Sequence, residues 1–203
     1  MKLPLFPLNA VLFPGGVLSL RVFEARYMDM ARACLRDQTP FGVCLIADGA
    51  AEVATTATPE AVGCLAHIRQ CDMEQLGLLK IRAIGGQRFR VLDSQRQADG
   101  LLVAEVDLIE ADTDVPLAPE HQACSRLLTN ILEEIGDKTS ADSLGAPIEA
   151  PYRLDSSVWV GNRLAEILPV PLQARQKLME LESASSRIDI IHTYLRQHAV
   201  LSA

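Results

Sequence analysis

The fold is decided by residues 18–35, LSLRVFEARYMDMARACL, where the spacing of the apolar residues changes. Up to Val22, apolar and polar residues alternate, which is the pattern of a strand with one buried face. Further along, apolar residues recur at the spacing of one helical face, at Tyr27, Met30, Ala31, Cys34 and Leu35. The stretch therefore predicts a strand that runs into an amphipathic helix.

Short strand patterns continue after this helix. Apolar runs or alternating residues predict strands over residues 41–46, 62–68, 79–83, 89–91 and 102–108. The first of these is apolar throughout, so we expect it to be fully buried. Gly85-Gly86-Gln87 predicts a hairpin turn, and the small polar residues 48–61 predict a surface loop. About six short strands and one helix are typical of a small β-barrel.

The second half of the sequence has the spacing of helices. Apolar residues from Cys124 to Ile135 predict one helix, with Gly136 as its C-terminal stop, and residues 137–155 show no regular period. Ser156 or Ser157 could cap a helix that ends near residue 168, before the Pro169-Val170-Pro171 break. Two further helices are predicted, over residues 172–181 and from Ser185 or Ser186 onward. We therefore expect an α+β protein with a barrel over residues 1–115 and a helical subdomain over residues 116–203.

Composition narrows the class of protein. Hydrophobic residues make up 49% of the 203 residues, charged residues make up 22%, and the formal net charge is −7. A globular protein is expected, and nucleic acid is a disfavoured partner because its binding depends on clustered cations. Five cysteines without paired C-x-x-C spacing indicate reduced thiols and a cytoplasmic protein. The apolar stretch over residues 3–20 contains three prolines and a Gly pair, so we interpret it as folded structure and not as a membrane span.

No catalytic or cofactor-binding motif is present in the sequence. The P-loop, dinucleotide, metalloprotease and G-x-S-x-G patterns are all missing, and the four histidines have no evident catalytic partner. Cys64, His67 and Cys71 are residue types that bind zinc, but their spacing matches no familiar zinc site. We therefore predict a protein that is not an enzyme and that holds no metal and no cofactor.

Residues 21–27, RVFEARY, form the densest cluster of large and charged side chains. One interpretation is packing together with an ion pair, because Glu24 suits a first helical turn and Tyr27 continues the buried face. The other interpretation is a rim, including Phe23 and Arg26, that contacts a ligand. The first is favoured because aromatic residues at helical spacing usually belong to the core.

These residues also carry a resemblance to a known family. The segments LPLFPL (residues 3–8), LFPG (12–15), LRVFEARY (20–27), FGVCLI (41–46), VGCLAHI (62–68) and GQRFRV (86–91) follow in the order of the N-terminal domain of Lon proteases. The helical segments LAEILPVP (164–171), KLME (177–180) and RI (187–188) resemble the end of small stand-alone members. The turn MEQLG (73–77) departs from the family pattern.

The resemblance implies a PUA-like β-barrel followed by a helical bundle, and a binding module that recognises unfolded or tagged polypeptide. It also implies a protease or ATPase as a second partner, although 203 residues leave no room for those domains and we expect no peptidase activity. Two alternatives stay open, an RNA-binding PUA-like protein and a small-ligand-binding protein. The residues nominated to contact polypeptide are Arg21, Phe23, Arg26, Arg88 and Phe89.

Overall fold

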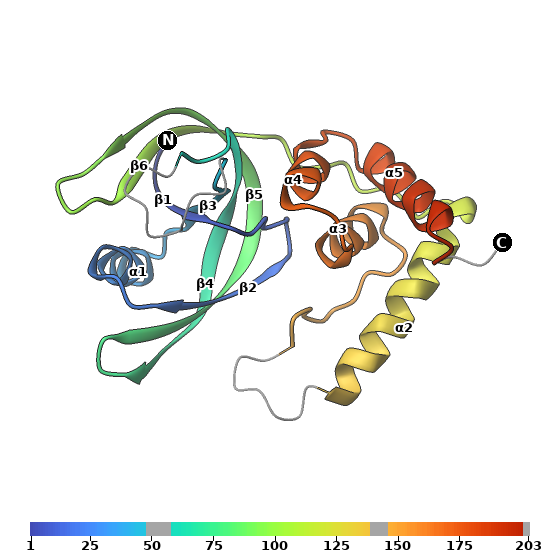
Figure 1. Ribbon diagram of the computed structural model, residues 1–203, viewed down its shortest axis with the longest axis horizontal. Helices are drawn as coiled ribbons and strands as arrows, with labels where there is room; N and C mark the ends of the chain where they lie inside the picture. Colours follow the sequence, from blue (N-terminus) through green and yellow to red (C-terminus); the bar gives the residue numbers. More distant parts are fainter. Residues whose placement is uncertain (48–57, 139–145, 201–203) are drawn as a thin grey trace. The chain divides into compact units, whose positions relative to one another are not determined.

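The computed structural model describes residues 1–47, 58–138 and 146–200. The chain divides into two compact units, Met1–Ala111 and Asp112–Ala203, so the division lies four residues before the expected one. Within the described residues, the first unit contains six strands and one helix, and the second contains four α-helices (Figure 1). This arrangement confirms the predicted α+β class.

The six strands are β1 (Lys2–Leu8), β2 (Val17–Val22), β3 (Phe41–Leu45), β4 (Val62–Gln75), β5 (Leu78–Arg96) and β6 (Leu102–Leu108). They pair in the order β2-β5-β4-β3-β1-β6, and β6 also pairs with the second half of β5. Five strands, β5-β4-β3-β1-β6, therefore close into a ring of pairings, which is the topology of a small barrel. Strand β2 lies outside this ring and pairs with the first half of β5.

One predicted turn is wrong. Gly85 and Gly86 lie inside the single long strand β5, and the turn comes earlier, at Leu76-Gly77, where Gly77 has a positive φ of 84°. A Cβ on Gly85 would lie 2.0 Å from the carbonyl oxygen of Phe13. The glycine therefore permits close packing within the strand, a role that its sequence context does not distinguish from a turn.

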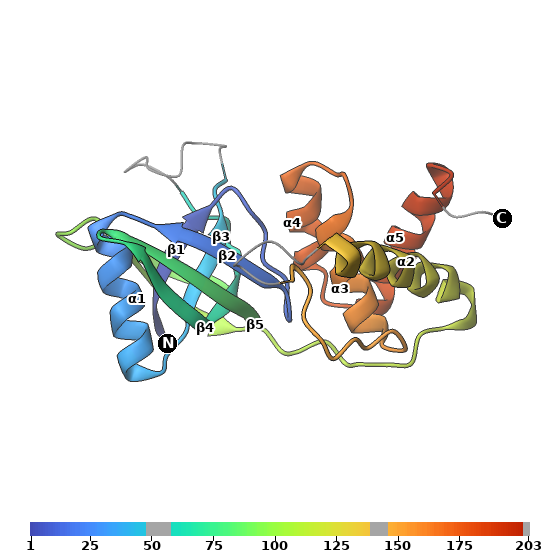
Figure 2. The ribbon, with the colours of Figure 1, turned by 90° about the horizontal axis from the view of Figure 1, so that it is seen from below.

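The core of the first unit has two clusters on the two faces of the strands. One joins Phe6, Phe41 and Val43 to helix α1 (Ala25–Asp37), which lies against the strands in Figures 1 and 2. The other contains Leu5, Cys44 and Phe89. Every residue of β3 is buried, as predicted for this segment, because the strand carries core residues on both faces.

The second unit contains α2 (Gln122–Lys138), α3 (Ser157–Ile167), α4 (Leu172–Glu180) and α5 (Ala184–Gln197). Helix α3 contacts the other three helices. The Ser156 side chain accepts a hydrogen bond from the backbone N of Trp159 at 3.0 Å, which confirms the predicted cap. The last helix starts slightly earlier than predicted, with Ser183 as its cap.

Helix α2 continues past Gly136, so the predicted stop at that residue is wrong. A glycine inside a helix costs only about 1 kcal/mol relative to alanine, which the rest of a 17-residue helix can offset.

The predicted loop over residues 48–61 and the predicted irregular segment over residues 137–155 fall partly outside the described residues. The N-terminal apolar stretch forms β1 and the approach to β2. Among the described residues, no helix is long and apolar enough to cross a membrane.

Candidate functional site: an apolar groove in the helical unit

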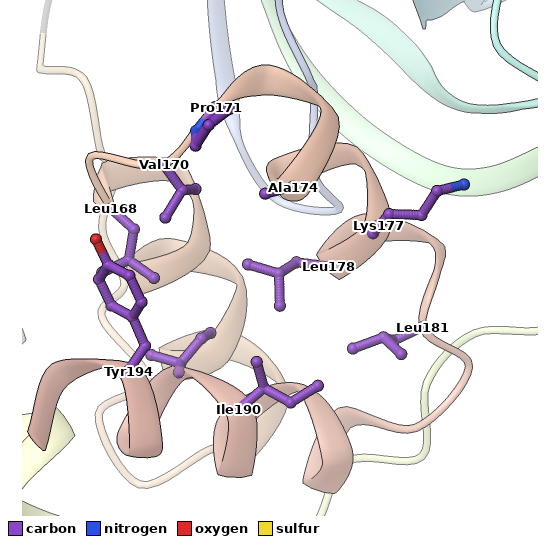
Figure 3. A pocket seen from close by; sticks show the side chains of 10 residues that line it. Leu168, Val170, Pro171, Ala174, Lys177, Leu178, Leu181, Ile190 and Tyr194 are labelled. Carbon is purple, nitrogen blue, oxygen red and sulfur yellow. The ribbon is translucent and has the colours of Figure 1, made fainter. Parts of the chain in front are cut away.

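An apolar groove of about 550 Å³ lies between helices α4 and α5 (Figure 3). Helix α4 begins directly after the Pro169-Val170-Pro171 segment, because a proline cannot continue the preceding helix and fits at the next helix start. The break turns the chain back, so that the linker, α4 and α5 all border the groove. Its lining residues are Leu168, Val170, Pro171, Ala174, Lys177, Leu178, Leu181, Ile190, Ile191 and Tyr194.

The chemistry of the groove is almost entirely hydrocarbon. Figure 3 shows Leu178 pointing toward the middle of the group, with Ile190 and Tyr194 opposite it on α5. Lys177 extends away from the middle, and its Nζ lies 2.7 Å from a carboxylate oxygen of Glu180. Ile190 is 48% exposed although it is a large aliphatic residue. Such a surface can take up apolar side chains.

Buried Arg187 holds the two helices that border the groove. Its guanidinium donates to the carbonyl oxygens of Leu178, at 2.9 Å, and Leu181, at 2.7 Å, at the end of α4. It also donates to Asp112, at 2.7 Å, and to Asn162 of α3, at 3.0 Å. One side chain of α5 therefore fixes the C-terminal end of α4 and its position relative to α3. We infer that the width of the groove depends on this network.

A second apolar pocket, of about 330 Å³, borders the first and shares Leu168 and Tyr194 with it. It is lined mainly by α2, α3 and the C-terminal part of α5. Leu127 and Ile131 contribute from α2 and Ile167 from α3. The two pockets together extend the apolar surface across several helices of the second unit.

The structure separates the five nominated residues. Arg21 and Phe23 border a smaller pocket of about 210 Å³ at the junction of β2 and α1, and both are exposed. Arg26 is engaged within the unit, because it binds Glu24 at 2.7 Å, donates to the Gly100 carbonyl at 3.0 Å and lies over the ring of Tyr27. This geometry agrees with the packing and ion-pair interpretation of residues 21–27.

Arg88 and Phe89 do not lie on the surface. Phe89 is 0% exposed within a core cluster, and Arg88 is 3% exposed. Phe89 fills space beside Gly63, where an added Cβ would lie 2.5 Å from its ring. A ligand cannot reach Phe89 in this conformation, so the two nominations are corrected on the ground of burial. Binding by Arg21, Phe23 or Arg26 stays a prediction.

The residues considered for zinc do not share one environment. Cys64 is buried and its Sγ lies 3.3 Å from the carbonyl oxygen of Gly86, whereas His67 is exposed. Within the described ranges, no three His, Cys, Asp or Glu residues are grouped so that they could hold a metal ion.

Two other cysteines are buried thiols. Burial raises the pKa of Cys44 to about 12 and that of Cys124 to about 11, so these thiols are poor nucleophiles.

Comparison with known proteins assigns this chain to a family. The profile of the ATP-dependent protease La (LON) substrate-binding domain matches residues 2–197. The chain belongs to the LON substrate-binding domain family. Lon protease 2 of Herpetosiphon aurantiacus is 28% identical over 97% of this chain, and protein cereblon of Xenopus tropicalis is 29% identical over 53% of it. The chain spans 24% of the length of each of these two relatives.

Solved structures agree with this assignment. The Lon N-terminal domain protein from Xanthomonas campestris has a TM-score of 0.76 and 36% identity, with 96% of this chain and 98% of that chain covered. The N-terminal domain of Mycobacterium avium complex Lon protease has a TM-score of 0.62 at 14% identity, which shows the shared fold. The matched part of the family is its substrate-binding domain and not a catalytic one.

Reasoning from the sequence missed the groove of this LON substrate-binding domain. The signal was present in two places. The Pro169-Val170-Pro171 break predicts that two helices meet at a sharp turn, and Ile190 falls off the helical face formed by Ile188, Ile191 and Leu195. An apolar residue on the outer face of the last helix could have suggested a binding surface.

Proposed function

We propose that this LON substrate-binding domain is a non-catalytic module that binds apolar segments of unfolded polypeptide in the groove between α4 and α5. The observation that carries the proposal is the groove itself. It has a volume of about 550 Å³ and a mainly aliphatic lining, and the large side chain of Ile190 is exposed at its border. Membership of a substrate-binding family supports polypeptide as the ligand.

Unfolded chains expose the apolar side chains that a folded protein buries, and a groove without charges in its interior selects for them. Burial of one leucine-sized side chain contributes about 1.5–3 kcal/mol. One or two such contacts give weak binding, so the polypeptide dissociates readily. Reversible binding of this kind suits a module that transfers its bound polypeptide to another protein. A protease or ATPase as the second partner, and a cytoplasmic location, belong to the same proposal.

A small apolar ligand is the second candidate. The groove falls within the range of about 300–1,000 Å³ that is typical of small-ligand pockets. Such pockets also place a few polar groups to orient the ligand, whereas Tyr194 and Lys177 are the two polar side chains in this lining. The composition of the groove therefore favours polypeptide segments of varied sequence over one defined small molecule.

The test uses fluorescence anisotropy with a labelled protein that is kept unfolded by reduction and carboxymethylation, and labelled RNA is titrated in parallel. Ile190→Asp places a charge at the border of the groove, and Thr193→Asp places the same charge one turn along α5, outside the lining. We expect Ile190→Asp to weaken polypeptide binding tenfold or more and Thr193→Asp to change it less than twofold. Equal affinities of the two variants, or saturable binding of RNA alone, would refute the proposal.

A further inference from the structure

Strand β2 has an open edge in the first unit. Among the described residues it pairs with β5 and with no other strand. Natural edge strands are usually protected by prolines, by several charges, by bulges or by a covering segment. The sequence of β2, VLSLRV, contains no proline and one charged residue, Arg21, which is paired with Glu74 at 3.2 Å. This edge therefore has little protection against an added strand.

The register identifies the backbone groups on that edge. The backbone N of Gly85 donates to the carbonyl oxygen of Gly16 at 2.8 Å, and the carbonyl oxygen of Gly85 accepts from the backbone N of Gly15 at 2.8 Å, so Gly16 directs its carbonyl oxygen toward β5 at the start of the ladder. Because the direction of the backbone groups alternates along a strand, the regular register that follows places the backbone groups of Leu18, Leu20 and Val22 toward β5. The N–H and C=O groups of the alternate residues, at positions 17, 19 and 21, lie on the open edge.

A pocket of about 210 Å³ borders the same edge. It is lined by Ser19 to Glu24, which follow one another along the chain, and by Phe6, Leu8 and Tyr27. The rings of Phe6 and Tyr27 are stacked with their centroids 3.9 Å apart, so the pocket has an aromatic wall. An apolar side chain of an added strand could enter here while its backbone pairs with β2.

Strand β1 borders the pocket but is a poor second partner for an added strand. It pairs with β6 only through Lys2 to Leu5 and with β3 through Leu5 to Leu8. Pro7 has no backbone N–H, so the last part of β1 lacks a donor at that position. The hydrogen bonds to an added strand would therefore come from β2.

We propose that the open edge of β2 binds an extended apolar segment of an unfolded polypeptide as an added strand, with one of its side chains in the pocket at the β2–α1 junction. This inference deepens the proposed function, because it rests on polypeptide as the ligand and assigns a second site in the other unit. Backbone pairing suits clients of varied sequence, since every residue except proline carries the same donor and acceptor.

A second copy of the chain fits this edge less well than a client segment. In an edge-to-edge pair, the other copy would offer its own β2. Its apolar residues Leu18 and Leu20 already pack against the core of their own unit, and the remaining side chains of the strand include Ser19 and Arg21. Over Leu18 to Val22 the other copy therefore offers the pocket only Ser19 and Arg21, whereas an unfolded client can offer an apolar side chain.

The first test alters the ligand and leaves the protein unchanged. A labelled apolar decapeptide without proline is compared with two versions in which alternate backbone amides are N-methylated, in the two possible registers. An added strand turns only one of its edges toward β2, so we expect one methylated version to bind about tenfold more weakly and the other to bind like the parent peptide. Equal affinity of all three peptides would overturn the inference.

The second test alters the edge. Ser19→Pro removes an amide donor that faces away from β5, and Ser19→Ala is its matched control. We expect unfolded-protein binding to weaken at least fivefold in Ser19→Pro alone, and Ile190→Asp to leave the preference between the two methylated registers unchanged. If no polypeptide binds the unaltered chain, both proposals fail. If polypeptide binds but neither Ser19→Pro nor methylation matters, or if Ser19→Pro only abolishes self-association, this inference alone fails.

Discussion

Arg187 is the residue whose loss should damage the helical unit most. Its side chain is 1% exposed and its partner Asp112 is 4% exposed, with the two groups 2.7 Å apart. Arg187→Met keeps much of the apolar volume but leaves the Asp112 carboxylate buried without its cation. Removal of one partner from a buried pair costs about 3–5 kcal/mol, and the carbonyl oxygens of Leu178 and Leu181 also lose a donor. We therefore expect a loss of about 4 kcal/mol in the free energy of unfolding.

Urea denaturation followed by tryptophan fluorescence reports the unfolding of the unit that contains Arg187. The chain contains one tryptophan, Trp159, and it lies in α3 of the same unit as Arg187. Arg153→Met is the matched control, because Arg153 forms an exposed ion pair with Asp114 in that unit and such pairs contribute about 0–1 kcal/mol.

A double variant isolates the buried charge. Adding Asp112→Asn to Arg187→Met removes the buried negative charge that Arg187 neutralises, so we expect about 1–3 kcal/mol to be recovered. A cost below about 1 kcal/mol for Arg187→Met, equal to that of Arg153→Met, would refute the reasoning. It would mean that water or neighbouring groups compensate Asp112 fully and that the guanidinium does not hold the groove helices together.

Three further predictions concern the first unit. Gly63→Ala should destabilise the protein by more than about 2 kcal/mol in denaturant titrations, since its Cβ would lie 2.5 Å from the Phe89 ring. Gly77→Ala is the matched control. Its Cβ would meet no atom within 4 Å, and it should cost about 1 kcal/mol because of the positive φ at that position. Phe89→Ala should cost about 3–5 kcal/mol by the same titration and leave the affinity of the folded protein for polypeptide unchanged. In thiol labelling at pH 8, partly exposed Cys71 should react in the native state, and Cys44, whose pKa is raised to about 12 by burial, should react only on unfolding.

Local patterns were sufficient where one face of an element decides its structure. The helix after residue 24, the buried strand β3 and the Ser156 cap all follow from periodicity or from a single side chain beside free backbone amides. Patterns were insufficient at Gly85 and Gly136, because glycine is compatible with a turn, a close approach or a helix interior. At Gly85 the choice was made by the carbonyl oxygen of Phe13, which lies 72 positions away in the chain.

The sequence by itself determined the α+β class, the change from strand to helix after Val22 and the resemblance to the LON substrate-binding family, since these depend on residues close together in the chain. Tertiary structure alone decided which residues can meet a ligand. It buried Phe89 and Arg88, joined Arg187 to Asp112 across 75 positions, and brought α4 and α5 together around an apolar groove. Burial depends on contacts between distant segments, and no local pattern encodes which apolar side chains remain uncovered.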